Sequence, residues 1–242
     1  MNSTFRINEL KAFLKKYQPV KTKQIVDFYR TFNPTINCNT IRWRIHELKA
    51  KQIIYSPVRG QYALQEKASF FHDPTKSINS LTKLVQKKHP TAKFSLYSTE
   101  WLTRFSNFTY PSNNLIIDIE TDSLNIVYNS IKKSCSNTFL SPNETKYDYY
   151  ISPNRENIIV NRLYVDAPLK NVDSSYYIPK LEKILVDLMI NDPIILMISK
   201  PEMKYIISNI QKTYHINYST LRRYAQKRHF GKKETAYGLL KV

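Results

Sequence analysis

The first fifty residues alternate apolar and polar positions with the period of an α-helix, in three successive stretches. Residues 5–17 form the first stretch. The second begins at Thr22, a residue type favoured at helix N-caps, and stops before Pro34, because proline interrupts a helix. The third begins near Asn37 or Asn39, which also suit the N-cap position. The pattern predicts three short amphipathic helices that bury their apolar faces together.

In the third helix, Ile41, Ile45 and Leu48 are spaced by four and then three residues, so they share one face. After this helix the pattern changes to the period of β-strands, in the short runs IIYSP and QYAL. Arg59 and Gly60 lie between the two runs, and Gly60 suits the positive φ of a tight turn. We therefore expect a β-hairpin directly after the third helix.

Three helices followed by a hairpin is the order of elements in a winged-helix DNA-binding domain. There the third helix enters the major groove, and the hairpin, or wing, lies along the DNA backbone, so cations on both serve one surface. The start of the second helix can add backbone contacts. The residues predicted to contact DNA are Lys21, Thr22, Lys23, Thr40, Arg42, Arg44, His46 and Arg59.

Two residues near this surface need a separate interpretation. Trp43 lies between arginines, and we expect it to pack against the hairpin rather than to stack on DNA. Gln52 follows the third helix at a position that is commonly glycine in helix C-terminal motifs. We expect the helix to end there through a strained residue or a longer turn.

Beyond residue 67, strand-like runs alternate with helical ones, and helices alone close the chain. Strands are predicted at 94–97, 114–120, 137–140 and 157–164, and helices near Ser80 and at 98–105, 121–133, 143–150, 179–190, 201–214 and 219–228. The prediction is an α+β protein with a winged helix-turn-helix domain at 1–67 and a linker at 68–79. A larger mixed α/β domain with a helical C-terminal end follows at 80–242.

The net charge of +18 is concentrated at the two ends of the chain. Residues 1–67 hold 13 Lys/Arg against 4 Asp/Glu, residues 68–200 hold 15 against 13, and residues 201–242 hold 9 against 2. Such asymmetry indicates a polyanionic partner, of which nucleic acid is the usual one. A general bias of the sequence toward lysine is the alternative explanation, above all for the C-terminal end.

The last predicted helix is itself rich in basic side chains. They form either a second contact with DNA or RNA, or a solvated face whose cations satisfy the negative end of the helix dipole. The sequence leaves both alternatives open. The residues concerned are Arg222, Arg223, Lys227 and Arg228.

The best candidate for catalysis is the set Asp118, Glu120 and Asp122, at the end of an apolar strand. Carboxylates in such a place hold divalent metal in nucleases, and Lys180 or Lys183 would supply the lysine that such a site needs. Because Asp122 also fits as the N-cap of the next helix, we favour a structural role and predict that the protein is not an enzyme.

The remaining sequence excludes most cofactor chemistry. Three glycines are too few for phosphate-binding loops, and the five histidines are scattered. Cys38 and Cys135 stand far apart, without the spacing of a zinc site or a disulfide framework. We predict no metal and no cofactor. There is no membrane-length apolar run and no signal-peptide pattern, so we expect a cytoplasmic protein.

Several stretches together resemble a known family. The segment NTIRWRIHELKAKQIIYSPVRGQYAL resembles the winged helix that opens antitoxins of type IV, AbiEi-like, abortive-infection systems. Further along, YSTEWL, IIVNRLYVDAPL, PKLEKILVDL and INYSTLRRYAQKR resemble the C-terminal domain of a family of that kind.

The resemblance implies a non-enzymatic repressor that binds inverted repeats in its own promoter. Its C-terminal domain would counteract a nucleotidyltransferase toxin without forming a stable complex with it. The resemblance also assigns DNA binding to helix and wing positions of this sequence, namely Thr40, Arg42, Arg44, Arg59, Gln61 and Tyr62. The alternatives are a metal-dependent nuclease that uses Asp118 and Glu120, and an RNA-binding regulator.

Overall fold

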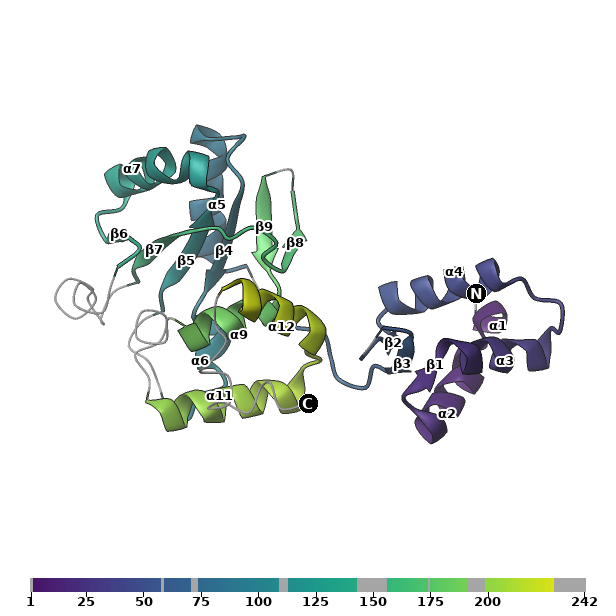
Figure 1. The fold of residues 1–242 in the computed structure, drawn as a ribbon. Coiled ribbons are helices and arrows are strands. Elements are labelled where there is room, and N and C mark those ends of the chain that lie inside the picture. The colour runs from purple at the N-terminus through teal and green to yellow at the C-terminus, as the bar shows by residue number, and fades with distance from the viewer. Residues whose placement is uncertain are drawn as a thin grey trace. The chain divides into compact units, whose positions relative to one another are not determined.

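The computed structural model describes residues 2–57, 59–70, 74–108, 113–142, 156–173, 175–190 and 199–228. They form an α+β fold, as the sequence predicts. The chain divides into two compact units (Figure 1). The first comprises residues 1–69 and 213–219, and the second comprises residues 70–212 and 220–242.

Short helices and a small antiparallel sheet make up the first unit. The strand order is β1-β3-β2, and the apolar pattern does not predict the two-residue strand β1. The elements are, in chain order, α1 (Asn2–Phe5), α2 (Ile7–Tyr17), β1 (Val20–Lys21), α3 (Thr22–Phe32), α4 (Cys38–Ala50), β2 (Ile54–Tyr55) and β3 (Gln61–Leu64).

The helices of the first unit share one core, as the apolar spacing predicts. The expected helix over 5–17 is interrupted at Arg6, whose φ of 49° lies in the left-handed region. α4 begins as predicted, since the Asn37 Oδ1 caps it by accepting a hydrogen bond from the Asn39 N–H at 2.8 Å. The buried core includes Leu10, Leu14, Val20, Ile25, Ile41, Ile45, Leu48 and Ile54.

The end of α4 confirms the prediction for Gln52, which adopts a left-handed φ of 56°. The N–H of Gln52 donates to the Lys49 carbonyl at 3.0 Å, and the N–H of Ile53 donates to the Leu48 carbonyl at 2.9 Å. These two bonds form a Schellman motif, which closes a helix and usually has glycine in the left-handed position.

A mixed six-stranded sheet forms the centre of the second unit, with strand order β6-β7-β5-β4-β9-β8. Strands β6, β7 and β5 run parallel to one another, β4 is antiparallel to β5, and β9 is parallel to β4. The strands are β4 (Phe94–Ser98), β5 (Leu115–Ile119), β6 (Thr138–Leu140), β7 (Ile158–Arg162), β8 (Leu169–Asn171) and β9 (Tyr176–Pro179).

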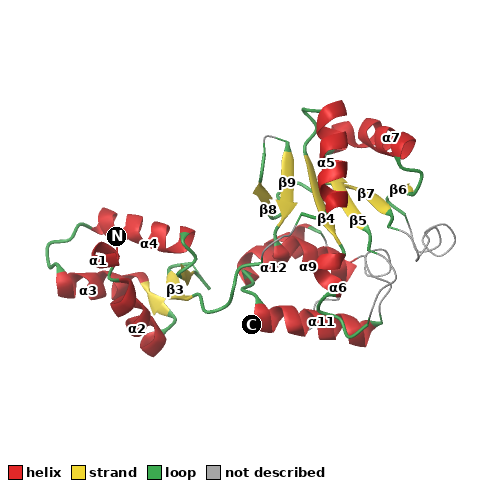
Figure 2. Cartoon of the chain, turned by 180° about the vertical axis from the view of Figure 1, so that it is seen from behind, coloured by secondary structure: helices red, strands yellow, loops and turns green. Residues whose placement is uncertain are grey.

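Helices cover both faces of this sheet (Figures 1 and 2). Helices α5 and α7 lie on one face, and α9 and α12 lie on the other, toward which Tyr97, Ile116 and Asp118 point. The helices are α5 (Lys76–Lys88), α6 (Glu100–Thr103), α7 (Leu124–Ser134), α9 (Leu181–Ile190), α11 (Lys200–Thr213) and α12 (Tyr218–Lys227).

Most boundaries in the second unit fall close to the predicted ones. The helix expected near Ser80 begins at Lys76, because the Thr75 hydroxyl caps it by accepting from the Ile78 N–H. Strands β8 and β9 were not predicted, since they are short and only partly buried. The helix expected at 143–150 lies outside the described residues. Within the described ranges, no helix is both long and apolar enough to cross a membrane.

Candidate nucleic-acid interface and a buried polar cluster

Helix α4 presents one face to the core and the opposite face to solvent. Ile41, Ile45 and Leu48 are buried, so the polar residues between them point outward. Arg42 Nη1 donates to Asn39 Oδ1 at 3.2 Å across one turn of the helix. The exposed face carries Asn39, Thr40, Arg42, Trp43 and His46.

Arg44 does not lie on this exposed face. It follows Ile41 by three residues and precedes Leu48 by four, which places it beside the buried stripe. Its guanidinium carbon lies 4.9 Å from the centre of the Tyr29 ring, and among the described residues its buried Nε has no hydrogen-bond partner. Burial raises the pKa of Tyr29 to about 12, against the opposing charge of Arg44. Arg44 therefore packs within the unit.

Trp43 also differs from expectation. Its side chain is 53% exposed, and its ring lies 5.5 Å from that of Phe5 in α1. The expected packing beneath the hairpin is therefore not observed. The aromatic partner of Trp43 comes from α1 instead. Trp43 adds an aromatic surface next to Arg42.

The hairpin and the start of α3 are held together. The Gly60 carbonyl accepts hydrogen bonds from the Thr22 N–H at 3.0 Å and from the Thr22 hydroxyl at 3.2 Å. Gly60 has a φ of 79°, so the predicted need for glycine at this turn is confirmed. Lys21, Lys23 and Arg59 are all exposed around this junction. The result is a compact basic surface.

The two hairpin residues assigned by resemblance are less accessible. Gln61 is half-buried and pairs with Lys21 in the sheet. Tyr62 is also half-buried and packs against the core of the unit. Only their outer edges can therefore reach a partner.

The basic helix α12 uses part of its charge inside the second unit. Arg228 forms an ion pair with Asp187, and only 8% of its side chain is exposed. Lys227 pairs with Asp166 at the surface. Arg223 is exposed and Arg222 is half-buried. Arg228, one of the residues predicted to make a second contact with nucleic acid, therefore belongs to an internal network and not to a binding face.

That internal network joins three elements of the second unit. Lys183 Nζ lies 2.5 Å from Asp118 Oδ2 and 2.6 Å from Asp187 Oδ2. The Tyr224 hydroxyl donates to Asp187 Oδ1 at 3.1 Å. With Arg228, the cluster contains two cations and two carboxylates, so its formal charges balance. We call Asp118, Lys183, Asp187 and Arg228 the buried charge cluster.

Burial and pairing act against each other in the buried charge cluster. Burial disfavours the ammonium of Lys183, but the two carboxylates outweigh it and raise the pKa of Lys183 well above its usual value. Burial also raises the pKa of Asp118, against the opposing charge of Lys183. Lys183 is therefore the protonated partner.

The three carboxylates singled out in the sequence do not converge. Asp118 is buried, whereas the Glu120 carboxylate accepts from the Lys93 N–H at 2.9 Å and from the Ser123 hydroxyl at 3.3 Å. Asp122 is exposed in the short 3-10 turn that follows β5. Among the residues that the structure describes, no group of three or more His, Cys, Asp or Glu is arranged to hold a metal ion.

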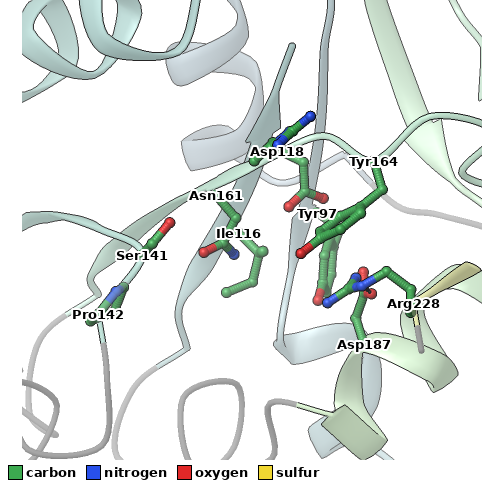
Figure 3. Close-up of a pocket in the computed structure, with 10 residues that line it drawn as sticks. Tyr97, Ile116, Asp118, Ser141, Pro142, Asn161, Tyr164, Asp187 and Arg228 are labelled. Atoms are coloured by element: carbon green, nitrogen blue, oxygen red, sulfur yellow. Dashed lines mark hydrogen bonds and ion pairs between the residues drawn. The ribbon is translucent and has the colours of Figure 1, made fainter. Parts of the chain in front are cut away.

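A cavity of about 200 Å³ lies beside the buried charge cluster. Asn161 of β7 and Ile116 of β5 line one side of it, and Tyr97 and Tyr164 face them (Figure 3). It opens where β5, β6 and β7 end at the same edge of the sheet. Ligands bind at the carboxyl ends of strands in many open α/β sheets. The cavity is lined by Tyr97, Ile116, Asp118, Ser141, Pro142, Asn161, Arg162, Tyr164, Asp187 and Arg228.

Sequence reasoning missed most of this cavity. Lys183 and Asp187 are four residues apart in a predominantly apolar helix, which is a signal for a buried ion pair. The sequence suggests Lys183 only as a partner for a metal site. Tyr97 and Asn161 carry no such signal, because their convergence depends on strand register.

The structure thus defines a two-unit α+β protein, with a basic helical unit and an α/β unit built around a buried charge cluster. The chain belongs to a family of unknown function (DUF6577), whose sequence model matches residues 40–237. The match begins in α4 and continues through α12. No curated protein matches the chain.

Proposed function

We propose that this protein is a DNA-binding transcriptional repressor whose first unit is a winged-helix domain. The observation that carries the proposal is the exposed face of α4, where Arg42 and Trp43 stand opposite the buried stripe of Ile41 and Ile45. The order of helices and strands supports it, because a helix followed by a hairpin is how winged helices present two contacts to DNA.

The two basic surfaces of the first unit would then have different roles. Arg42 stands on the helix that enters the major groove, where arginine reads guanine through two hydrogen bonds. Lys21, Lys23 and Arg59 lie at the junction of α3 and the hairpin, where they would neutralise phosphates. The positive charge of the first 67 residues suits such a polyanion.

Selection of preferred sites from random DNA, followed by titration of Arg42→Ala, tests this proposal. The variant should lose affinity for the selected site by about 1–3 kcal/mol and lose preference at one base position. Lys15→Ala, which removes an exposed cation from α2, is the matched control and should bind almost normally. Absence of any preferred sequence in the wild-type protein would overturn the proposal.

For the second unit we propose the role that the family resemblance implies, protection against a nucleotidyltransferase toxin. Such a toxin should stop growth when expressed alone, and coexpression of this protein should restore it. Deletion of residues 1–67 should release the promoter and leave protection in place. If the deletion variant loses repression but keeps protection, the two roles belong to different units. If the full chain gives no protection, the proposed antitoxin role is wrong.

A metal-dependent nuclease is the alternative for the second unit, since Lys183 lies beside Asp118. Incubation of the purified protein with Mg²⁺ or Mn²⁺ and labelled DNA or RNA tests it. Cleavage that Asp118→Asn abolishes would favour the nuclease. RNA that co-purifies with the protein would instead favour an RNA-binding regulator.

A further inference from the structure

The cavity of the second unit contains a buried hydroxyl without a partner. The Tyr97 side chain is fully buried, and among the described residues its Oη makes no hydrogen bond. Ser95 Oγ, two residues earlier on the same face of β4, is in the same state. Buried polar atoms in proteins are nearly always paired, so an unpaired hydroxyl that lines a cavity indicates a missing partner.

The opposite side of the cavity presents a carboxylate next to a carboxamide. Asp118 and Asn161 are direct neighbours in the register of β5 and β7. Lys183 binds only one oxygen of Asp118, Oδ2, and the other carboxylate oxygen can accept a further hydrogen bond. The amide of Asn161 offers one donor group and one acceptor. Side by side, the two suit a ring edge that carries an N–H next to a carbonyl or ring nitrogen.

The charge and the shape of the cavity restrict further the class of ligand that it can bind. The buried charge cluster is balanced, so the inner part of the cavity does not demand a charged ligand. Ile116 and the Tyr164 ring give it apolar walls suited to a flat ring. Arg162 also borders the cavity, but it follows Asn161 in β7 and pairs with Ile119, so its side chain leaves the strand on the opposite face of the sheet. The cavity therefore suits a neutral, flat ring whose edge carries hydrogen-bonding groups, as a nucleobase does.

We propose that this cavity binds the base of a nucleotide, with Asp118 and Asn161 on the base edge. The Tyr97 hydroxyl completes the contacts with the base. The site belongs entirely to the second unit, and the inference does not depend on DNA binding by the first.

Calorimetric titration of the full-length protein with AMP, GMP, CMP and UMP tests the proposal. At least one should bind with a stoichiometry of one and raise the melting temperature. Ribose 5-phosphate and inorganic phosphate, which lack a base, should bind much more weakly. Equal binding of ribose 5-phosphate, or no binding of any nucleotide, would overturn the proposal.

Two variants then locate the site. Tyr97→Phe removes only the unpartnered hydroxyl, so it should fold with unchanged or higher stability and bind the nucleotide about three- to tenfold more weakly. Tyr176→Phe removes a hydroxyl from β9, outside the cavity lining, and should bind normally.

Arg42→Ala, in the first unit, should also bind the nucleotide normally. If Arg42→Ala weakens binding and Tyr97→Phe does not, the nucleotide occupies the nucleic-acid surface and the proposal fails.

Discussion

Gln52 adopts an unfavourable backbone conformation that the hydrogen bonds of its neighbours impose. Its left-handed φ of 56° is required by the Schellman motif that ends α4, and its side chain is exposed. An L-residue with a Cβ is disfavoured in that region by about 1–2 kcal/mol relative to glycine. Because the side chain makes no buried contact, its replacement by glycine should lose little packing energy.

We predict that Gln52→Gly raises the free energy of unfolding of the first unit by about 1 kcal/mol. Urea denaturation followed by circular dichroism measures it. Lys51→Gly is the matched control, because Lys51 has a negative φ of −80° and gains nothing from glycine. A lower stability of Gln52→Gly would mean that the glutamine side chain contributes more than its strain costs.

His215 gives the first unit a dependence on pH. Its ring lies 4.2 Å from the Tyr55 ring, and burial, with a smaller effect of Lys67, lowers its pKa below the ordinary 6.5. The unfolded chain therefore binds a proton before the folded chain does. The stability contributed by this group is present above pH 6.5 and is lost as the pH falls through and below that value.

We predict that the wild-type protein loses stability between about pH 7 and pH 5, and that His215→Phe reduces this loss. Phenylalanine keeps an aromatic ring against Tyr55 but cannot be protonated. Denaturation at a series of pH values measures the difference. His46→Phe, at an exposed position, should leave the profile as in the wild type, and an equal effect of both variants would contradict the assignment.

At the scale of elements, α9 is held to the sheet by charge as well as by apolar packing. Its residues from Leu181 to Met189 are buried, and Lys183 and Asp187 bring one face of the helix to Asp118 of β5. Because four charges balance inside the protein, removal of one leaves an uncompensated charge without water. The cluster therefore stabilises only as a complete set.

We predict that Lys183→Met destabilises the second unit by about 3–5 kcal/mol. The added change Asp118→Asn should recover part of this loss, since it restores a balance between Asp187 and Arg228. Thermal and urea unfolding of both variants measures the recovery. Lys180→Met, at an exposed position next to α9, is the control, and a Lys183→Met protein as stable as the control would show that the cluster is not needed.

At the scale of the whole molecule, the cations behind the net charge of +18 fall into two groups, those in ion pairs and those exposed to solvent. In the second unit Lys183 and Arg228 form buried ion pairs, and Lys227 forms an ion pair at the surface. In the first unit the cations of the α3–hairpin junction are exposed. Net charge therefore overstates what the C-terminal helix offers to a polyanion.

We predict that DNA affinity falls steeply as salt increases, because each phosphate contact releases counterions. Arg59→Ala should weaken binding on all sequences alike and reduce the slope of log affinity against log salt by about 1. Fluorescence anisotropy between low and physiological salt measures the slope. An unchanged slope would mean that Arg59 makes no phosphate contact.

The helical spacing of Ile41, Ile45 and Leu48 identified the buried face of α4, because that face depends only on the period of the helix. The glycine at the hairpin and the strain at Gln52 were also predicted, since both follow from local backbone geometry. Arg44 and Trp43 were misplaced for the opposite reason. Their surroundings are set by Tyr29 and by Phe5, which come from other helices.

The sequence by itself determined the α+β class, most element boundaries and the concentration of charge at the chain ends, because these depend on short-range periodicity and composition. Only the tertiary structure decided that Asp118 pairs with Lys183 and does not form a carboxylate cluster with Glu120. It also decided that Tyr97 and Asn161 line one cavity. Those contacts join residues tens of positions apart, and strand order and register bring them together. No local pattern encodes that order.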